Sequence, residues 1–177
     1  MKKLGKFQMT SGKARVSDPC YDKDTWCAGT VSSVQNGSWI AHVVKKDCRE
    51  WGERCSRLIA HFVDFPAPTK CDSKWKVQDI DVGVDSGQAG IFDETYFKDD
   101  EVVSQTGRIG NHSPICKEEP WYSICCDRTL NDVGAGVIPY GCVSSSGFGD
   151  GSYVCSVIKK GKKVVAIMID FGVDKEE

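Results

Sequence analysis

The pattern of apolar and polar positions gives its clearest structural prediction near the C-terminus. Residues 153–158 place successive side chains on opposite faces, and residues 164–169 are apolar without interruption. An uninterrupted apolar run of strand length indicates burial on both faces of a sheet. Gly161, among four lysines between the two runs, suits a tight turn that needs one residue at positive φ. The two runs therefore predict a β-hairpin whose second strand lies in the interior of a sheet.

A second hairpin is predicted in the first quarter of the chain. Asn36-Gly37 suits both central positions of a type I′ turn, so residues 29–35 are expected to pair with residues 38–44. In that register Val34 lies opposite Trp39. Further strands are predicted at residues 4–9 and 13–17, as a first hairpin, and at residues 55–63, 77–84 and 136–144.

One good helix is predicted, at residues 121–129. Its start is marked by Glu118-Glu119-Pro120, because proline is tolerated in the first turn and acidic residues favour the positive end of the helix dipole. Asp93 suits the N-cap of a short helical turn, and polar residues 98–117 predict a long surface excursion. Pro139 argues for an edge position or a bulge in the strand that contains it.

These elements define the expected fold class. Eight or nine strands with one or two short helices make a mainly β protein of the α+β class. The expected architecture is an antiparallel β-sandwich or an open barrel with a helix packed against it. A chain of 177 residues suits a single domain that covers residues 1–177.

Composition and charge narrow the setting and the partners. The chain is 40% hydrophobic and 27% charged, as is usual for soluble globular proteins, and has no apolar run long enough to span a membrane. Residues 1–12 lack the apolar segment of a signal peptide, so we expect a cytoplasmic location and reduced cysteines rather than a disulfide framework. A formal charge of −2 disfavours a dedicated nucleic-acid binder. No cofactor is predicted.

Five segments, spread over most of the chain, carry a resemblance to a known family. They are Val16-Ser-Asp-Pro-Cys-Tyr21, Asp24-Thr-Trp-Cys27, Val82-Gly-Val-Asp-Ser-Gly-Gln-Ala-Gly-Ile-Phe-Asp93, Ala135-Gly-Val-Ile-Pro139 and Ser144-Ser-Ser-Gly-Phe-Gly-Asp-Gly-Ser-Tyr153. In these segments the chain resembles the bacterial domain-of-unknown-function family 4241, in its short form. The resemblance implies a bacterial or phage source and a cytosolic setting, and it implies no particular activity.

Two glycine-rich turns are the strongest candidates for a binding site. Asp85-Ser86-Gly87-Gln88 offers a carboxylate, a hydroxyl and an amide side chain, and glycines alternate with other residues from Gly147 to Gly151. Such turns can expose several backbone N–H groups to one point, as anion-binding nests do. A structural reading is also open, in which the turns need special backbone angles and Asp85 forms an Asx turn. The predicted ligand-binding residues are Asp18, Tyr21, Asp85, Ser86, Gly87, Gln88, Ser146, Gly147, Gly149, Asp150 and Ser152.

A metal site or a catalytic nucleophile is less well supported by the sequence than a binding site at the glycine-rich turns. The carboxylates from Asp79 to Asp93 lack the frame of a calcium loop, and the cysteine pairs near the N-terminus are too widely spaced for a structural zinc site. Cys20 with His42 or His61 is the one Cys/His combination considered for a nucleophile. No catalytic residue and no metal ligand is predicted.

Three functional hypotheses follow. The first is a small non-enzymatic binding protein that holds a small polar ligand, including a nucleotide, or a protein partner through its glycine-rich turns. Free amides suit an anionic ligand, whereas the carboxylates of the same turns oppose it. The second is a hydrolase that uses Asp85 or Asp150 with a bound divalent cation. The third is an interaction or immunity protein whose edge strands bury a partner or a second copy of the chain.

Overall fold

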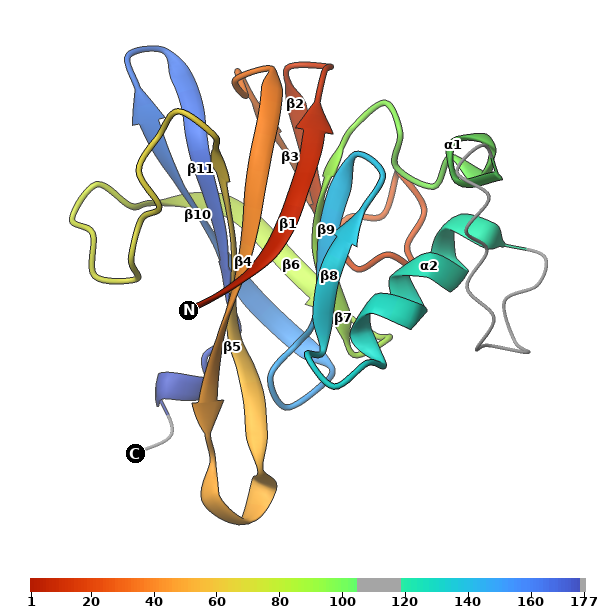
Figure 1. Ribbon diagram of the computed structural model, residues 1–177, viewed down its shortest axis with the longest axis vertical. Helices are drawn as coiled ribbons and strands as arrows, with labels where there is room; N and C mark the ends of the chain where they lie inside the picture. Colours follow the sequence, from red (N-terminus) through yellow and green to blue (C-terminus); the bar gives the residue numbers. More distant parts are fainter. Residues whose placement is uncertain (105–118, 176–177) are drawn as a thin grey trace.

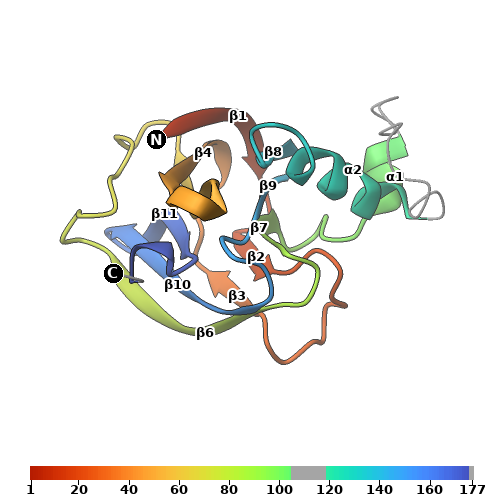
Figure 2. The same ribbon diagram turned by 90° about the horizontal axis from the view of Figure 1, so that it is seen from below.

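The computed structural model describes residues 1–104 and 119–175. Within them, eleven strands form two antiparallel sheets that pack face to face, and two α-helices lie beyond the smaller sheet (Figures 1 and 2). This is the mainly β sandwich that the sequence predicts, with more strands than the eight or nine expected. None of the described helices has the length and apolar character needed to cross a membrane.

The larger sheet contains the C-terminal hairpin. Its six strands are, in spatial order, β1 (Lys2–Met9), β4 (Gly37–Asp47), β5 (Glu53–Phe62), β11 (Lys163–Asp170), β10 (Gly151–Lys160) and β6 (Lys76–Val84). The predicted hairpin is β10–β11, and Gly161 in its turn has φ 60°. Strand β11 lies between β5 and β10, and every residue from Val164 to Ile169 is buried. The prediction of this hairpin and of its interior second strand is confirmed.

The smaller sheet contains two strands, β8 and β9, where the sequence pattern predicts one. Its five strands are, in spatial order, β3 (Gly29–Ser32), β2 (Lys13–Ser17), β7 (Gln88–Asp93), β9 (Gly141–Ser145) and β8 (Ala135–Ile138). The predicted single strand at residues 136–144 is two strands, because Pro139 and Tyr140 form a tight turn in which Tyr140 has φ 60°. Proline commonly precedes a residue at positive φ in such turns.

Strands β1 and β2 belong to different sheets, so the predicted hairpin of residues 4–9 with residues 13–17 is wrong. Strand β1 pairs with β4, whereas β2 pairs with β3 and β7. The crossing between the sheets is held by Asp93, whose Oδ2 accepts hydrogen bonds from Thr10 N at 2.5 Å and Ser11 N at 3.0 Å. The local turn signal contains no information about a carboxylate so distant in the sequence.

Asn36-Gly37 does not form the predicted type I′ hairpin turn. Strand β3 pairs with β2, and β4 pairs with β1 and β5, so Trp39 lies opposite Phe7 rather than Val34. The side chain of Asn36 instead accepts a hydrogen bond from Gly12 N at 2.7 Å. This bond ties the second crossing between the sheets to the first.

Apolar side chains fill two layers. The core between the sheets includes the fully buried Trp39, Leu58, Ile91, Ile167 and Ile169. A second cluster lies between the smaller sheet and helix α2 (Pro120–Thr129), where the Trp121 ring meets Phe92 and Phe97 at centroid distances of 5.1 Å. The smaller sheet is therefore covered on both faces, which explains why β7 is buried along its whole length.

The helical predictions are confirmed in part. Helix α2 coincides with the helix predicted at residues 121–129. After Asp93 the chain forms a hydrogen-bonded turn and not a helix, with Asp93 Oδ1 accepting from Thr95 N at 3.0 Å. The start of the predicted excursion at residues 98–117 contains helix α1 (Asp100–Ser104), and the rest of it lies outside the described residues.

The outer face of the larger sheet buries a pair of histidines. The rings of His42 and His61 stack at 5.2 Å, and their Nε2 atoms are 3.1 Å apart. His61 Nδ1 lies 3.0 Å from Phe62 O and 2.9 Å from Phe65 O, so this nitrogen carries a hydrogen and donates it to these carbonyl oxygens. Burial, together with His61 and the positive charge of Lys3, lowers the pKa of His42 from 6.5 to about 4.

Stability is expected to fall as the pH drops from 6.5 to 4. In this window the unfolded chain binds a proton at His42 that the folded chain does not, so folding loses about 1–3 kcal/mol. Urea denaturation at several pH values measures the loss. His42→Leu, which removes the titrating group, should flatten this part of the profile relative to the wild type. An unchanged slope in the variant would show that His42 does not control it.

Candidate functional site

Asp18 lies at the centre of the predicted loop site and is completely buried. It follows β2 directly. Its Oδ2 accepts hydrogen bonds from Asp85 N at 2.9 Å and from Ser86 N at 2.8 Å. Its Oδ1 accepts from Ser86 Oγ at 2.7 Å and from Cys20 N at 2.8 Å. One buried carboxylate therefore holds the β6–β7 turn against the end of β2.

The glycine-rich turn between β9 and β10 meets the β6–β7 turn at Gly87. Asp150 Oδ1 accepts a hydrogen bond from Gly87 N at 3.0 Å, and Gly87 O accepts one from Ser146 N at 3.0 Å. Tyr21 joins the same junction, since its hydroxyl donates to Asp85 Oδ2 at 2.7 Å. Two turns that are far apart in the sequence thus converge, together with the segment after β2. We call this group of contacts the loop junction.

The backbone N–H groups of the β6–β7 turn are not free, contrary to the sequence-based expectation. Those of Asp85, Ser86 and Gly87 all donate to the carboxylates of Asp18 and Asp150. A carboxylate of the protein thereby takes the place that a bound anion takes in a nest. A ligand-binding role for these residues stays a prediction, and an anion would have to compete with the carboxylates for the same donors.

Two of the predicted residues face away from the loop junction. Gln88 is buried below α2, where its Oε1 accepts from Thr129 Oγ1 at 3.0 Å and its Nε2 lies 3.6 Å from Cys126 Sγ. Ser152 donates its hydroxyl hydrogen to Asp81 on the exposed side of β6. These contacts join strands and helix to each other and do not converge on the junction.

The β9–β10 turn needs glycine for its backbone. Gly147 has φ 61° and Gly149 has φ 114°. A Cβ at Gly147 would lie 2.8 Å from Val173 Cγ2, so the turn packs closely on the C-terminal segment. Ser146 Oγ closes the turn by donating to Gly149 O at 2.8 Å. Between these glycines, Phe148 remains partly exposed at the outer side of the turn.

The surroundings of Cys20 differ from those of the histidines considered as its partners. His42 and His61 bond to each other on the outer face of the larger sheet, whereas Cys20 lies beside Asp18. Burial and the neighbouring Asp18 raise the pKa of the Cys20 thiol to about 12. An activated cysteine nucleophile needs a lowered pKa, so the environment of Cys20 works against that role.

The two carboxylates of the hydrolase hypothesis are engaged within the loop junction. Asp85 accepts from the Tyr21 hydroxyl, and Asp150 accepts from Gly87 N. In the part of the chain that the structure describes, no group of three or more His, Cys, Asp or Glu side chains is arranged to hold a metal ion. The described geometry thus adds no support to that hypothesis.

A cleft of about 450 Å³ opens beside the β9–β10 turn, and we call it the hairpin cleft. It is lined by Trp51, from the tip of the β4–β5 hairpin that extends beyond the sheets in Figure 1, and by Phe148. The exposed fractions of these side chains are 68% and 43%. Arg49 and Lys46 line the same cleft. Two exposed aromatic rings from separate elements, beside cationic side chains, mark a surface suited to covering by a ligand.

Cationic side chains outnumber carboxylates among the described residues at the hairpin cleft. Arg54 places its guanidinium carbon 5.8 Å from the centroid of the Phe148 ring. Asp47 is the one carboxylate residue among the lining residues, and its Oδ1 accepts from Arg49 N at 2.9 Å. Asp150 belongs to the same glycine-rich turn as Phe148, but its carboxylate is bonded to Gly87 within the loop junction. Asp150, one of the carboxylates expected to oppose an anionic ligand, is therefore engaged outside the hairpin cleft.

The sequence pattern did not single out Trp51 or Arg49. They lie in a connection, residues 45–53, whose many charged residues predict only a loop or an irregular turn. The signal that could have found them is a tryptophan in a turn rich in charged residues, because such a ring has no apolar neighbours to bury it. Arg49 also has φ 57°, a conformation that a non-glycine residue rarely adopts.

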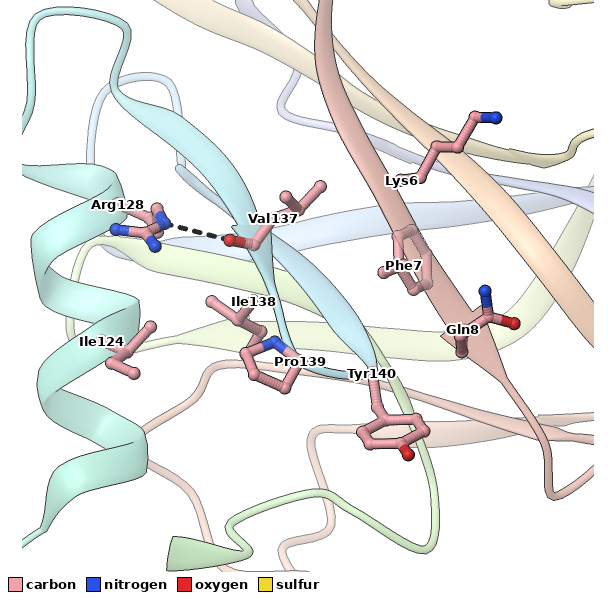
Figure 3. A pocket seen from close by; sticks show the side chains of 9 residues that line it. All are labelled: Lys6, Phe7, Gln8, Ile124, Arg128, Val137, Ile138, Pro139 and Tyr140. Atoms are coloured by element: carbon pink, nitrogen blue, oxygen red, sulfur yellow. Dashed lines mark hydrogen bonds between the residues drawn. The ribbon is translucent and has the colours of Figure 1, made fainter. Parts of the chain in front are cut away.

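A groove lies between β1 and α2, along the free edge of β8 (Figure 3). One part of it, about 410 Å³, has Phe7 on the β1 side, Ile124 on the α2 side and Pro139 between them. Arg128 reaches from α2 to β8, where its Nε donates to Val137 O at 3.0 Å. A second part of about 380 Å³ continues towards the start of β1 and shares Arg128 and Val137. We call both parts together the edge groove.

Comparison with known proteins does not assign either surface. No family model, curated protein or solved structure matches the chain. The resemblance to the domain-of-unknown-function family 4241 therefore stays a prediction that rests on the quoted segments.

Asp18→Ala is expected to destabilise the fold by about 3 kcal/mol, because it leaves the N–H groups of Cys20, Asp85 and Ser86 without an acceptor. Asp18→Asn should cost less, since one side-chain oxygen remains. Urea denaturation followed by circular dichroism measures both. Asp24→Ala removes the same charge at an exposed position and should change stability by less than about 0.5 kcal/mol. Equal effects at Asp18 and Asp24 would contradict the central role of Asp18.

Proposed function

We propose that the protein is a non-catalytic binding protein that holds a small anion with a planar ring, such as a nucleotide, in the hairpin cleft. The observation that carries the proposal is the meeting of Trp51 and Phe148, both exposed, with Arg49 and Lys46 in one cleft of about 450 Å³. A volume of this size lies in the range of small-molecule sites.

The aromatic rings supply the first half of the recognition. Exposed rings are costly to leave in water, and a planar base that stacks on them removes apolar area from solvent. Stacking of one base on an aromatic side chain contributes about 1–3 kcal/mol and tolerates different bases. The cation of Arg54 on Phe148 helps to fix one of the two rings.

The cationic side chains supply the second half. Arg49 is exposed, and its guanidinium makes no hydrogen bond or ion pair with any residue that the structure describes. A guanidinium is suited to two parallel hydrogen bonds with a phosphate. Lys46 adds a second positive charge, although its Nζ also lies 3.9 Å from Asp174 Oδ1. A ligand that joins a planar ring to a phosphate fits both halves.

The glycine-rich turn has a structural part in this proposal. Its glycines bring the chain close to the C-terminal segment, and Phe148 is thereby held at the margin of the cleft. The non-catalytic character is supported by the loop junction, where the candidate carboxylates already accept hydrogen bonds and the pKa of Cys20 is raised.

Isothermal titration calorimetry with AMP, GMP, CMP and UMP tests the proposal, with adenosine as the uncharged probe. We expect at least one nucleotide to bind with a Kd below about 1 mM and adenosine to bind at least tenfold more weakly than AMP, because it lacks the phosphate. Trp51→Ala and Phe148→Ala should each weaken binding about tenfold, and Arg49→Gln should remove the preference for AMP over adenosine.

Trp26→Ala is the matched control, since Trp26 is 84% exposed and does not line the hairpin cleft. It should bind nucleotides as the wild type does. The proposal is wrong if none of the four nucleotides binds, or if Trp26→Ala weakens binding as much as Trp51→Ala.

A further inference from the structure

We infer that the edge groove docks an acidic, extended segment of a protein partner. This surface is separate from the hairpin cleft, and the inference does not depend on nucleotide binding. It rests on three features of the groove: two strand edges that lie along it, an apolar lining, and an excess of positive charge.

The edge groove runs along the outermost strands of the two sheets. Strand β1 ends the larger sheet and β8 ends the smaller one. They pack closely where Gly5 faces Val137, since a Cβ at Gly5 would lie 2.9 Å from Val137 Cγ2. Among the described residues, each of these strands pairs with one other strand only. An unpaired strand edge is a common docking place for an extended peptide.

The lining of the edge groove suits the apolar side chains of such a segment. Val137 and Pro139 of this lining are partly exposed, whereas Phe7 and Ile124, on opposite sides, and Ile138, between them, are buried (Figure 3). The eight residues of β1 span roughly 25 Å at the usual rise of a strand. The groove is therefore long enough for about six to eight residues of an extended chain, with every second side chain directed towards the lining.

The charge of the edge groove selects an acidic segment. Among the described residues, its lining includes Lys2, Lys3, Lys6 and Arg128, and no aspartate or glutamate. None of these four cations forms an ion pair with another residue that the structure describes. In Figure 3, Lys6 and Arg128 lie on opposite sides of the groove. Because the whole chain has a formal charge of −2, this cationic strip is a local feature and not the general character of the surface.

The same features argue against a nucleic acid as the occupant. Single strands are held by aromatic rings on which bases stack, as well as by cations. The one tyrosine that lines the edge groove, Tyr140, already stacks on Tyr96 with a centroid distance of 3.8 Å. The other apolar residues that the structure describes in the groove are aliphatic apart from Phe7, which is buried. An acidic peptide with apolar side chains at alternate positions fits this lining better than a sugar-phosphate chain.

Selection from a phage-displayed library of random 12-residue peptides tests the inference on the full chain. We expect the enriched peptides to be rich in Asp and Glu, with apolar residues at alternate positions. The most enriched peptide, labelled with fluorescein, is then measured by fluorescence anisotropy. Its affinity should fall at least tenfold between 50 and 300 mM NaCl and at least tenfold in the double variant Lys2→Glu/Lys6→Glu.

The matched control is Lys160→Glu/Lys162→Glu, which makes the same charge change on exposed lysines near the tip of the β10–β11 hairpin. It should alter the affinity less than twofold. Circular dichroism confirms that both double variants are folded, and Arg128→Gln gives a second test on the opposite side of the groove. Amide hydrogen exchange with the peptide bound should slow at residues 2–8 and 135–138.

Three results would overturn the inference. The first is a selection that enriches no peptides or enriches peptides without acidic residues. The second is an equal loss of affinity in the two double variants, or protection from exchange that lies away from β1 and β8. The third is binding of a single-stranded 20-nucleotide DNA or of phosphatidylglycerol vesicles that Lys2→Glu/Lys6→Glu abolishes while the peptide affinity is unchanged.

Discussion

Buried carboxylates that accept backbone N–H groups hold the irregular parts of this sandwich in place. Asp18 and Asp93 are both completely buried, and neither forms an ion pair with a described residue. Each accepts hydrogen bonds from segments far along the chain, Asp18 from the β6–β7 turn and Asp93 from the β1–β2 crossing. A charge can be buried at tolerable cost only when hydrogen bonds replace its water. The turns and the carboxylates are therefore stable only together.

These internal hydrogen bonds are the reason why we propose binding surfaces outside the loop junction. The loop junction brings together polar groups of two turns, yet its donors and acceptors mostly bond to each other. The hairpin cleft and the edge groove differ from it, because Trp51 and Phe148 in the cleft are exposed and Lys2, Lys3 and Lys6 along the groove form no ion pair with another described residue. The β9–β10 turn contributes to both the loop junction and the hairpin cleft. Asp150 accepts a hydrogen bond from Gly87 in the junction, while Phe148 lines the cleft.

The sequence predicts those parts of the fold that depend on neighbouring residues. Alternation and apolar runs define β10 and β11, and proline with acidic residues marks the start of α2, because these signals act within a few residues. The crossings from β1 to β2 and from β3 to β4 resemble hairpin turns locally, but Asp93 and Asn36 redirect them through distant contacts. The same limit applies to the site. The convergence of the glycine-rich turns agrees with the sequence-based grouping of their residues, whereas the engagement of their amides by Asp18 depends on a tertiary contact.

Amide hydrogen exchange at Asp85, Ser86 and Gly87, followed by NMR, tests most directly whether the protein's own carboxylates occupy the β6–β7 turn. The account predicts that these three amides exchange slowly, as the buried strand amides of β11 do, and that adding AMP does not change their rates. Exchange at the rate of exposed loops, or a marked slowing when AMP is added, would show that the turn is open and that the ligand binds there.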